Sequence, residues 1–244
     1  MPTLRGASKR GGNSQRVVAG TLSLATFNAA NDTQKMNMIN NVLQRTKIDP
    51  NQSDQDAQRW LNAIGWADRT PTVVADEDAL EAEKFSGDYK HGTPYLYHTD
   101  APVGSTSDAK DFADQYFGGG KHYASFGIAG GGTYMATDWD DSLGYGHGAR
   151  SAYQFKAILN NNAKIITQSN LHNKMRSMRR THPQLVQYIS RQSERDTILA
   201  SMLGYNVIKN GSYYTILDRS ATTVARKGYH GATFKKKGNP WKYT

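Results

Sequence analysis

Cysteine is absent from this chain of 244 residues. Its absence excludes disulfide scaffolds, thiolate nucleophiles and zinc sites with cysteine ligands, and it leaves the redox compartment open. No apolar run approaches the roughly 20 residues that a membrane-spanning helix needs. The N-terminal segment carries positive charge but no apolar stretch of the kind found in secretory signals, so we do not expect secretion by a signal peptide.

Acidic residues are also scarce relative to basic ones. The chain has 21 of them against 30 lysines and arginines, which gives a net charge of +9. Much of the excess lies in residues 1–20 and 223–244, which are rich in glycine and which we expect to be flexible basic arms. The second arm interleaves Tyr229, Phe234 and Trp241 with its cations. Such a pattern can bind a phosphate backbone or an acidic protein surface, and a solvated arm without a partner is the alternative.

The spacing of apolar residues predicts helices first and short strands afterwards. Helices are predicted over residues 33–46, 53–64, 76–85 and 108–116, and in two pieces over 183–203. Strands are predicted at residues 95–98, 153–159, 163–167, 205–208 and 213–217, the last two forming a hairpin. This order indicates an α+β fold rather than regular βαβ alternation. We therefore expect a helical N-terminal region at 21–90 and a core at 91–222, between the two arms.

Four residues of the central segment can build one pocket. Tyr134 and Tyr145 are eleven residues apart, Ser142 stands three before the second tyrosine, and His98 ends an earlier apolar strand. Two aromatic rings can sandwich a flat heteroaromatic amide while a histidine and a serine hydrogen-bond its polar edge. The sequence thus predicts a binding site for such a ring.

A metal site is not expected. His91, His98, His122 and His147 are scattered through the same region, but no pair has the spacing of a metal-binding helix. The acidic residues at 138–141 are typical of an exposed turn.

Three motifs resemble those of the ADP-ribosyltransferase fold, in the branch that contains diphtheria toxin and the poly(ADP-ribose) polymerases. Leu96-Tyr97-His98-Thr99 is similar to its Leu-Phe-His-Gly strand, Gly132-Thr133-Tyr134-Met135-Ala136 to its Gly-x-Tyr-Phe-Ala strand, and Ser142-Leu143-Gly144-Tyr145 to its Ser-x-x-Tyr motif. Residues 163–166, 203–208 and 214–221 resemble segments of phage-encoded members. The resemblance spans about residues 55–221 and implies a split β-sandwich core that binds NAD as a substrate.

The resemblance also implies a set of NAD-binding residues, namely His98, Thr99, Gly132, Tyr134, Ser142 and Tyr145. His98 would hydrogen-bond the adenosine ribose, and the backbone of Thr99, where the family has glycine, would hold the nicotinamide carboxamide. Tyr134 and Tyr145 would stack on the nicotinamide ring, and Ser142 would contact its amide. No metal is implied.

The implied catalytic residues are His98, Tyr134 and Tyr213. The family places a glutamate at the start of its last motif strand, where this chain has Tyr213. A phenol can hydrogen-bond a ribose hydroxyl, but it is protonated at neutral pH and is a poor general base.

Two functions follow from the resemblance. The first is a toxin-like phage mono-ADP-ribosyltransferase that modifies a host protein or nucleic acid and releases nicotinamide. The alternative is a virion protein with this fold and a degenerate active site, held on a capsid, a portal or packaged DNA by its basic ends. Both place the protein in the virion or the host cytoplasm.

Overall fold

The computed structural model describes residues 20–44, 55–67, 69–100, 116–117, 131–143, 151–192, 194–225 and 231–233. Its strands are β1 (Thr72–Val74), β2 (Leu96–Asp100), β3 (Thr133–Ala136), β4 (Ser151–Leu159), β5 (Ile165–Thr167), β6 (Val207–Asn210), β7 (Tyr213–Ile216), β8 (Thr222–Ala225) and β9 (Gly231–Thr233). Its helices are α1 (Leu24–Ala29), α2 (Asp32–Gln44), α3 (Gln55–Ala63), α4 (Glu77–Ser86), α6 (Trp139–Leu143), α7 (Gln168–Thr181), α8 (Pro183–Ser190) and α9 (Arg195–Met202), with a 3₁₀ turn η2 (Arg219–Ala221).

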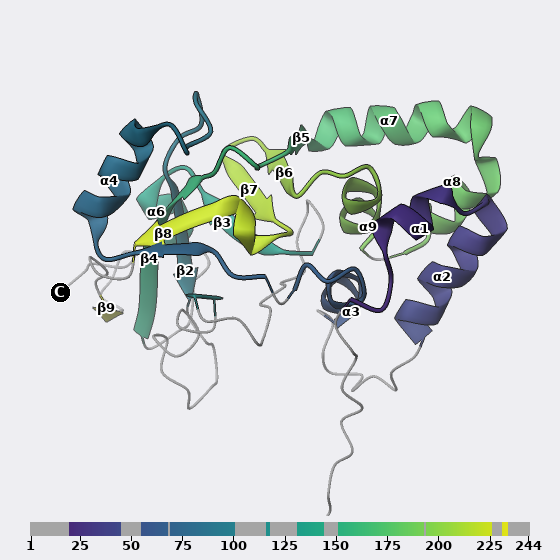
Figure 1. Ribbon diagram of the computed structural model, residues 1–244, viewed down its shortest axis with the longest axis horizontal. Helices are drawn as coiled ribbons and strands as arrows, with labels where there is room; N and C mark the ends of the chain where they lie inside the picture. The colour runs from purple at the N-terminus through teal and green to yellow at the C-terminus, as the bar shows by residue number, and fades with distance from the viewer. Residues whose placement is uncertain are drawn as a thin grey trace, which may run out of the picture.

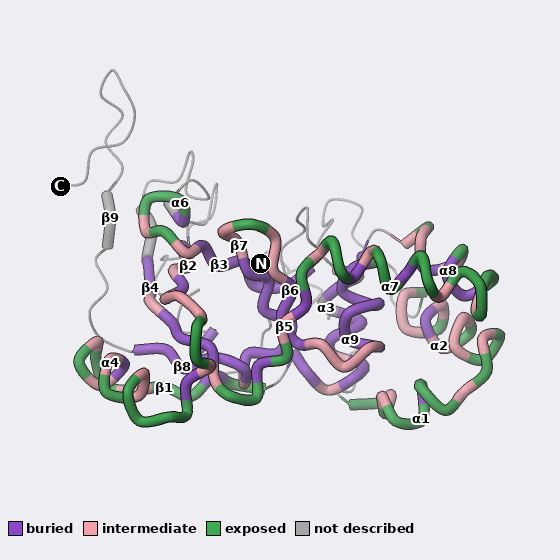
Figure 2. Tube along the Cα trace, turned by 90° about the horizontal axis from the view of Figure 1, so that it is seen from above, coloured by how far each residue is buried: buried purple, intermediate pink, exposed green. Residues whose placement is uncertain are grey.

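The predicted α+β class is confirmed. In the described part of the chain, eight strands form a mixed open sheet in the order β1-β8-β4-β2-β3-β7-β6-β5, and β9 pairs with β4 off this path. The β1–β8 and β5–β6 pairs are parallel and the other pairs are antiparallel. Helix α4 lies at the β1 end of the sheet, and α1–α3 and α7–α9 gather at the β5 end (Figure 1). The central strands are buried, while the helices at both ends have exposed outer faces (Figure 2).

The sheet is held together weakly at one point, between β2 and β3. Strand β2 pairs with β4 over five residues, and β3 pairs with β7 over four. Between β2 and β3, within the residues that the structure describes, the register contains the single pair Tyr97 and Ala136. We call the position of this single pair, and the strand ends beside it, the β2–β3 split.

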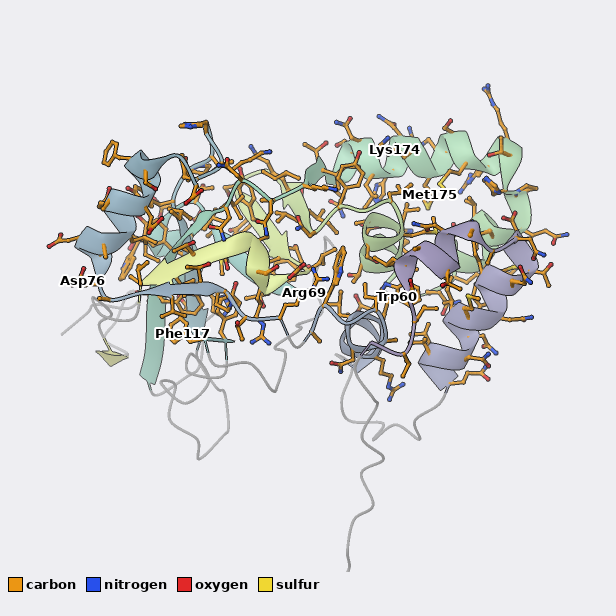
Figure 3. The ribbon with its side chains drawn as sticks, in the orientation of Figure 1. Trp60, Arg69, Asp76, Phe117, Lys174 and Met175 are labelled. Atoms are coloured by element: carbon orange, nitrogen blue, oxygen red, sulfur yellow. The ribbon has the colours of Figure 1, made fainter. Side chains whose placement is uncertain are left out.

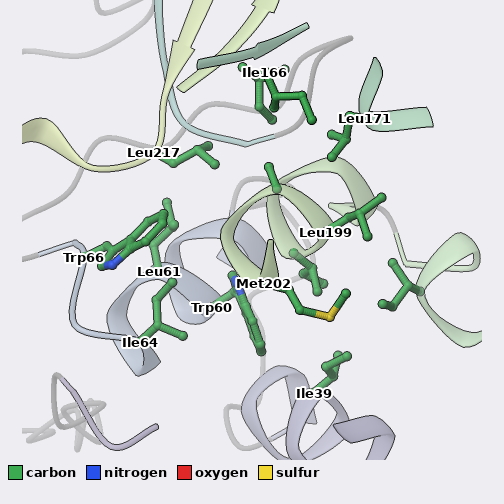
Figure 4. Close-up of a cluster of buried hydrophobic side chains, with 14 of the residues drawn as sticks. Ile39, Trp60, Leu61, Ile64, Trp66, Ile166, Leu171, Leu199, Met202 and Leu217 are labelled. Atoms are coloured by element: carbon green, nitrogen blue, oxygen red, sulfur yellow. The ribbon is translucent and has the colours of Figure 1, made fainter. Parts of the chain in front are cut away.

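Two large hydrophobic clusters stabilise the fold. One lies among the helices and reaches the sheet through residues such as Ile166 and Leu217 (Figure 4). At its centre Trp60 packs edge-on against Phe27 at 5.4 Å and donates a hydrogen bond from Nε1 to Ser201 Oγ at 2.7 Å. The second cluster is built by alternate residues of the central strands together with the rings at positions 116 and 117.

Local sequence signals explain where several helices begin and end. The side chain of Asp76 accepts a hydrogen bond from the amide of Ala79 at the start of α4, and Gly87, with φ of 98°, ends it. Helix α3 is followed by Gly65 with φ of 75°. The predicted helices over 33–46, 53–64 and 76–85 are thus confirmed as α2, α3 and α4. The predicted hairpin is confirmed as β6 and β7, and residues 183–203 do form two helices.

Several elements differ from the prediction. Helices α1 and α6 were not predicted, and the acidic residues at 138–141, expected to form an exposed turn, lead into α6. The first strand is β1, not the strand near Tyr95, because β1 finds a parallel partner in β8. Residues 223–225, assigned from the sequence to the C-terminal arm, are buried in β8, and β9 adds a further strand. Helix α7 was not predicted, although Leu171, Met175 and Met178 follow helical spacing and Thr167 caps it through Asn170 N.

Some predictions lie outside the described residues. These are the helix over 108–116, apart from its last residue, and most of the two basic arms. The division into domains at 20, 90 and 222 stays a prediction.

Candidate functional site

His98 lies in the β2–β3 split and touches the opposite strand. Its Nδ1 is 2.5 Å from the carbonyl oxygen of Tyr134 on β3. A carbonyl only accepts hydrogen bonds, so Nδ1 carries the proton and donates it, and in the neutral ring Nε2 is then the acceptor nitrogen. The ring also contacts Phe155 at 5.1 Å and stacks on Tyr116 at 6.4 Å. The imidazole is therefore fixed in both tautomer and orientation.

The contact with His98 shows which way the backbone of β3 faces. In an antiparallel strand, the N–H and C=O of one residue point to the same side. The Tyr134 carbonyl points toward β2, so the backbone of this residue faces the split rather than β7. The Tyr134 side chain is 8% exposed and belongs to the hydrophobic cluster between the sheet and the helices. The ring of Tyr134 is thus part of that cluster.

Thr99 and Ser142, which the sequence placed in separate motifs, are brought together by a buried network. Their hydroxyl oxygens are 3.0 Å apart, and Gln154 Nε2 donates to both at 2.9 Å. Ser142 Oγ in turn donates to the carbonyl of Trp139 at 2.8 Å. Thr99 and Gln154 are register partners on β2 and β4, so their side chains share one face of the sheet. The network ties the end of β2 to α6.

Gln154 was not predicted from the sequence. The sequence did contain an indication, because Gln154 is a polar residue in an otherwise alternating strand. In the structure its side chain is fully buried. A polar side chain at such a position requires hydrogen-bond partners. Only the pairing of β2 with β4 identifies those partners.

Gly132 and Tyr213 are placed by the pairing of β3 with β7. A Cβ on Gly132 would lie 2.8 Å from the Ile216 carbonyl oxygen and 2.8 Å from Thr215 Cγ2, so the close approach of β7 requires glycine here. Tyr213, at the start of β7, is half-buried and pairs with Ala136. Because opposed residues share a face, Tyr213 lies on the same face as Tyr134. Tyr145 lies outside the described residues.

The start of β3 is held by the first turns of α9. Thr197 Oγ1 accepts from the amide of Gly131 at 2.6 Å and lies 2.8 Å from its carbonyl oxygen. Buried Glu194 lies against the same glycine. Asp196, in the first turn of α9, accepts a hydrogen bond from Gln168 Nε2 at 2.9 Å and lies 3.1 Å from His172 Nε2.

A charged side chain of β4, near the site, forms an ion pair with α4. Lys156 Nζ lies 2.9 Å from Glu81 Oε1, and the Tyr95 hydroxyl donates to the same carboxylate. These hydrogen bonds, that of Tyr95 first, hold the pKa of Glu81 below its ordinary value. Burial and the neighbouring carboxylate raise the pKa of Tyr95. The cluster attaches α4 to the sheet.

No group of three histidine, aspartate or glutamate side chains in the described residues is arranged to hold a metal ion. His91 packs edge-on against Tyr89 on the surface, and His122 and His147 lie outside the described residues. Within the same part of the chain, every helix is too short or too polar to cross a membrane.

Neither a protein-family model nor a curated protein nor a solved structure matches this chain.

Proposed function

We propose that the chain is a phage-type mono-ADP-ribosyltransferase, with an ADP-ribosyltransferase-like split β-sandwich, that uses NAD to modify a host protein or nucleic acid. The observation that carries the proposal is the imidazole of His98 in the β2–β3 split, with Nδ1 bound to the backbone of Tyr134. That hydrogen bond makes Nε2 the acceptor nitrogen of the neutral ring, which suits a ligand hydroxyl group. The motif similarity and the single register pair between β2 and β3 add support.

Each residue around the split has a different role in binding NAD. His98 Nε2 accepts a hydrogen bond from a hydroxyl of the adenosine ribose. The backbone of Thr99, beyond the last β2–β3 pair, holds the nicotinamide carboxamide. Ser142 is fully buried and bonded to Trp139, so its role in this proposal is to hold Thr99 in place together with Gln154. Ser142 is thus a positioning residue.

The transfer step breaks the bond between the nicotinamide nitrogen and C1′ of the ribose. The electron pair leaves with nicotinamide, which becomes neutral, and an oxygen or nitrogen of the acceptor bonds to C1′ and loses its proton to water. The ribose carries positive charge in the transition state, as in glycoside hydrolysis. Tyr213, on the face that bears Tyr134 and Thr99, donates a hydrogen bond to a ribose hydroxyl, while His98 contacts NAD from the opposite face at the β2–β3 split. Because a phenol is a weak base, rate enhancement depends mainly on orientation of the two reactants.

The test is release of nicotinamide from labelled NAD, with and without bacterial lysate, combined with calorimetric measurement of NAD binding. His98→Ala should abolish release and weaken binding about tenfold, which is the effect of losing one hydrogen bond. His91→Ala removes an exposed imidazole far from the split and is the matched control. Equal release by the wild type and His98→Ala would refute the site, and no NAD binding by the wild type would refute the function.

A further inference from the structure

Helices α7 and α8 form a surface of one charge. Residues 168–193 contain five lysines and arginines and no aspartate or glutamate. The five are Lys174, Arg176, Arg179, Arg180 and Arg191, and all are exposed. We call them the α7–α8 basic surface. It lies at the end of the molecule away from β2 and β4, with Lys174 labelled on α7 (Figures 1 and 3).

Neighbouring elements leave this charge uncompensated. Among the described residues, the acidic side chains that contact α7 and its connection to α8 are Asp32 and Asp196. Asp32 is 2.9 Å from His182 Nδ1, and Asp196 is 3.1 Å from His172 Nε2 and 3.4 Å from Arg195 Nε. Within the described residues, none of the five cations of the α7–α8 basic surface forms an ion pair.

Two of the arginines flank a hollow between the helices. Helices α7 and α8 pack together, with Ser190 Oγ 3.8 Å from Met175 Sδ. Next to this contact is an open hollow of about 490 Å³. It is lined by Arg179 of α7, by Pro183, Gln187 and Ser190 of α8, and by Arg191. Two arginines thus line one shallow depression whose other lining residues are uncharged.

Repulsion between the arginines of α7 destabilises this helix. Arg176 is three residues before Arg179 and four before Arg180, and like charges at these spacings repel on a helix surface. The helix dipole favours Arg179 and Arg180 in the last turn but not Arg176 in the middle of the helix. A polyanion bound to this surface would remove the repulsion.

We propose that the α7–α8 basic surface binds the phosphate backbone of a nucleic acid. Four of its five cations are arginines, whose planar guanidinium groups pair with phosphate through two hydrogen bonds. Protein partners usually need an apolar anchor, whereas nucleic-acid interfaces are polar and strongly positive. Among the described residues, the large exposed hydrophobic side chains are Val73 and Phe85, and neither lies on α7 or α8. The surface is separate from the β2–β3 split, so this proposal stands without the proposed enzymatic function.

The test compares two variants of the full chain that lose the same charge. Arg179→Gln/Arg191→Gln removes the cations of the hollow, and Lys90→Gln/Lys164→Gln removes two exposed or half-exposed cations elsewhere. Binding to a fluorescein-labelled DNA duplex of random sequence is followed by anisotropy from about 50 to 200 mM salt. The arginine variant should bind on the order of tenfold more weakly at the low end, and its slope of log K against log salt should fall by about 1.8, the value for two lost phosphate contacts. The lysine variant should match the wild type.

Equal weakening of both variants would mean that binding follows net charge alone, and it would overturn the proposal. So would unchanged binding of the arginine variant. Competition by polyglutamate as strong as that by unlabelled duplex would favour an acidic protein and also overturn it. The thermal midpoint of the arginine variant should stay close to that of the wild type, because the lost dipole interaction of Arg179 is offset by the lost repulsion with Arg176, so weaker binding would not come from misfolding.

Discussion

Gly131 stands where three elements meet, and replacing it with alanine should destabilise the whole fold. A Cβ at this position would lie 2.1 Å from Ala57 Cβ of α3 and 2.6 Å from Glu194 Oε2. Carbon atoms in contact are normally about 3.5–4.0 Å apart, so α3 and β3 would have to separate by well over an ångström. Thr197 holds the Gly131 amide and carbonyl, which prevents the strand from moving alone. Overpacking of this kind costs about 3 kcal/mol.

Urea denaturation of Gly131→Ala, Ala57→Gly and the double variant measures the effect. Ala57→Gly alone should cost about 1–2 kcal/mol, from helix propensity and a lost methyl group. In the double variant the nearest clash is absent, so its loss of stability should be smaller than the sum of the two single losses by more than about 1 kcal/mol. A loss below about 0.5 kcal/mol for Gly131→Ala, or strict additivity in the cycle, would refute the close approach of α3 to β3.

Two further predictions concern buried polar contacts. Gln154→Leu leaves the Ser142 hydroxyl without one of its hydrogen-bond donors and should lower the free energy of unfolding by about 1–3 kcal/mol. Gln187→Leu, at an exposed position, is the control in thermal unfolding. Equal midpoints for the two variants would contradict the network. Glu81 has a lowered pKa in the folded protein, so its contribution to stability is complete above its ordinary pKa of about 4.3 and is lost as the pH falls through the lowered value. Urea denaturation between about pH 5 and 3 should show a steeper loss of stability in the wild type than in Glu81→Gln. Parallel curves would show that the contacts of Glu81 with Tyr95 and Lys156 do not affect folding.

The two glycines before β3 show how a sequence motif can be interpreted in two ways. Glycine clusters are typical of tight turns or of close approach to a ligand, and the sequence alone favours neither. In the structure, Gly131 is approached by α3 and α9, and Gly132 is approached by β7. Both glycines are therefore explained by packing between elements that are distant in the chain.

The motif Asp218-Arg219-Ser220 is likewise explained by the fold. Asp218 accepts from the amide and hydroxyl of Ser220 and pairs with Arg69 at 2.6 Å. Buried Arg219 donates to the backbone carbonyls of Tyr116 and Ala67. These contacts connect the end of β7 to chain segments about 100 to 150 residues earlier, which no local pattern could indicate.

The sequence by itself determined the elements whose signals are local. Helices α2, α3 and α4 follow from apolar residues at helical spacing and from caps such as Asp76 and Gly87, and the β6–β7 hairpin follows from its turn. These signals act within a few residues, so they survive without tertiary context. His98 and Tyr134 were singled out from residue type and spacing, and the structure joins the His98 imidazole to the backbone carbonyl of Tyr134, whereas their two rings pack in different clusters.

Tertiary structure alone decided the rest. Strands β1 and β8 have three and four residues, too few for a periodic signal, and they exist because each lies beside the other. The partners of Gln154 depend on the register of β2 with β4, and the β2–β3 split depends on where two strands stop pairing. Such features come from contacts between segments far apart in the chain, whose energies are absent from any local window of sequence.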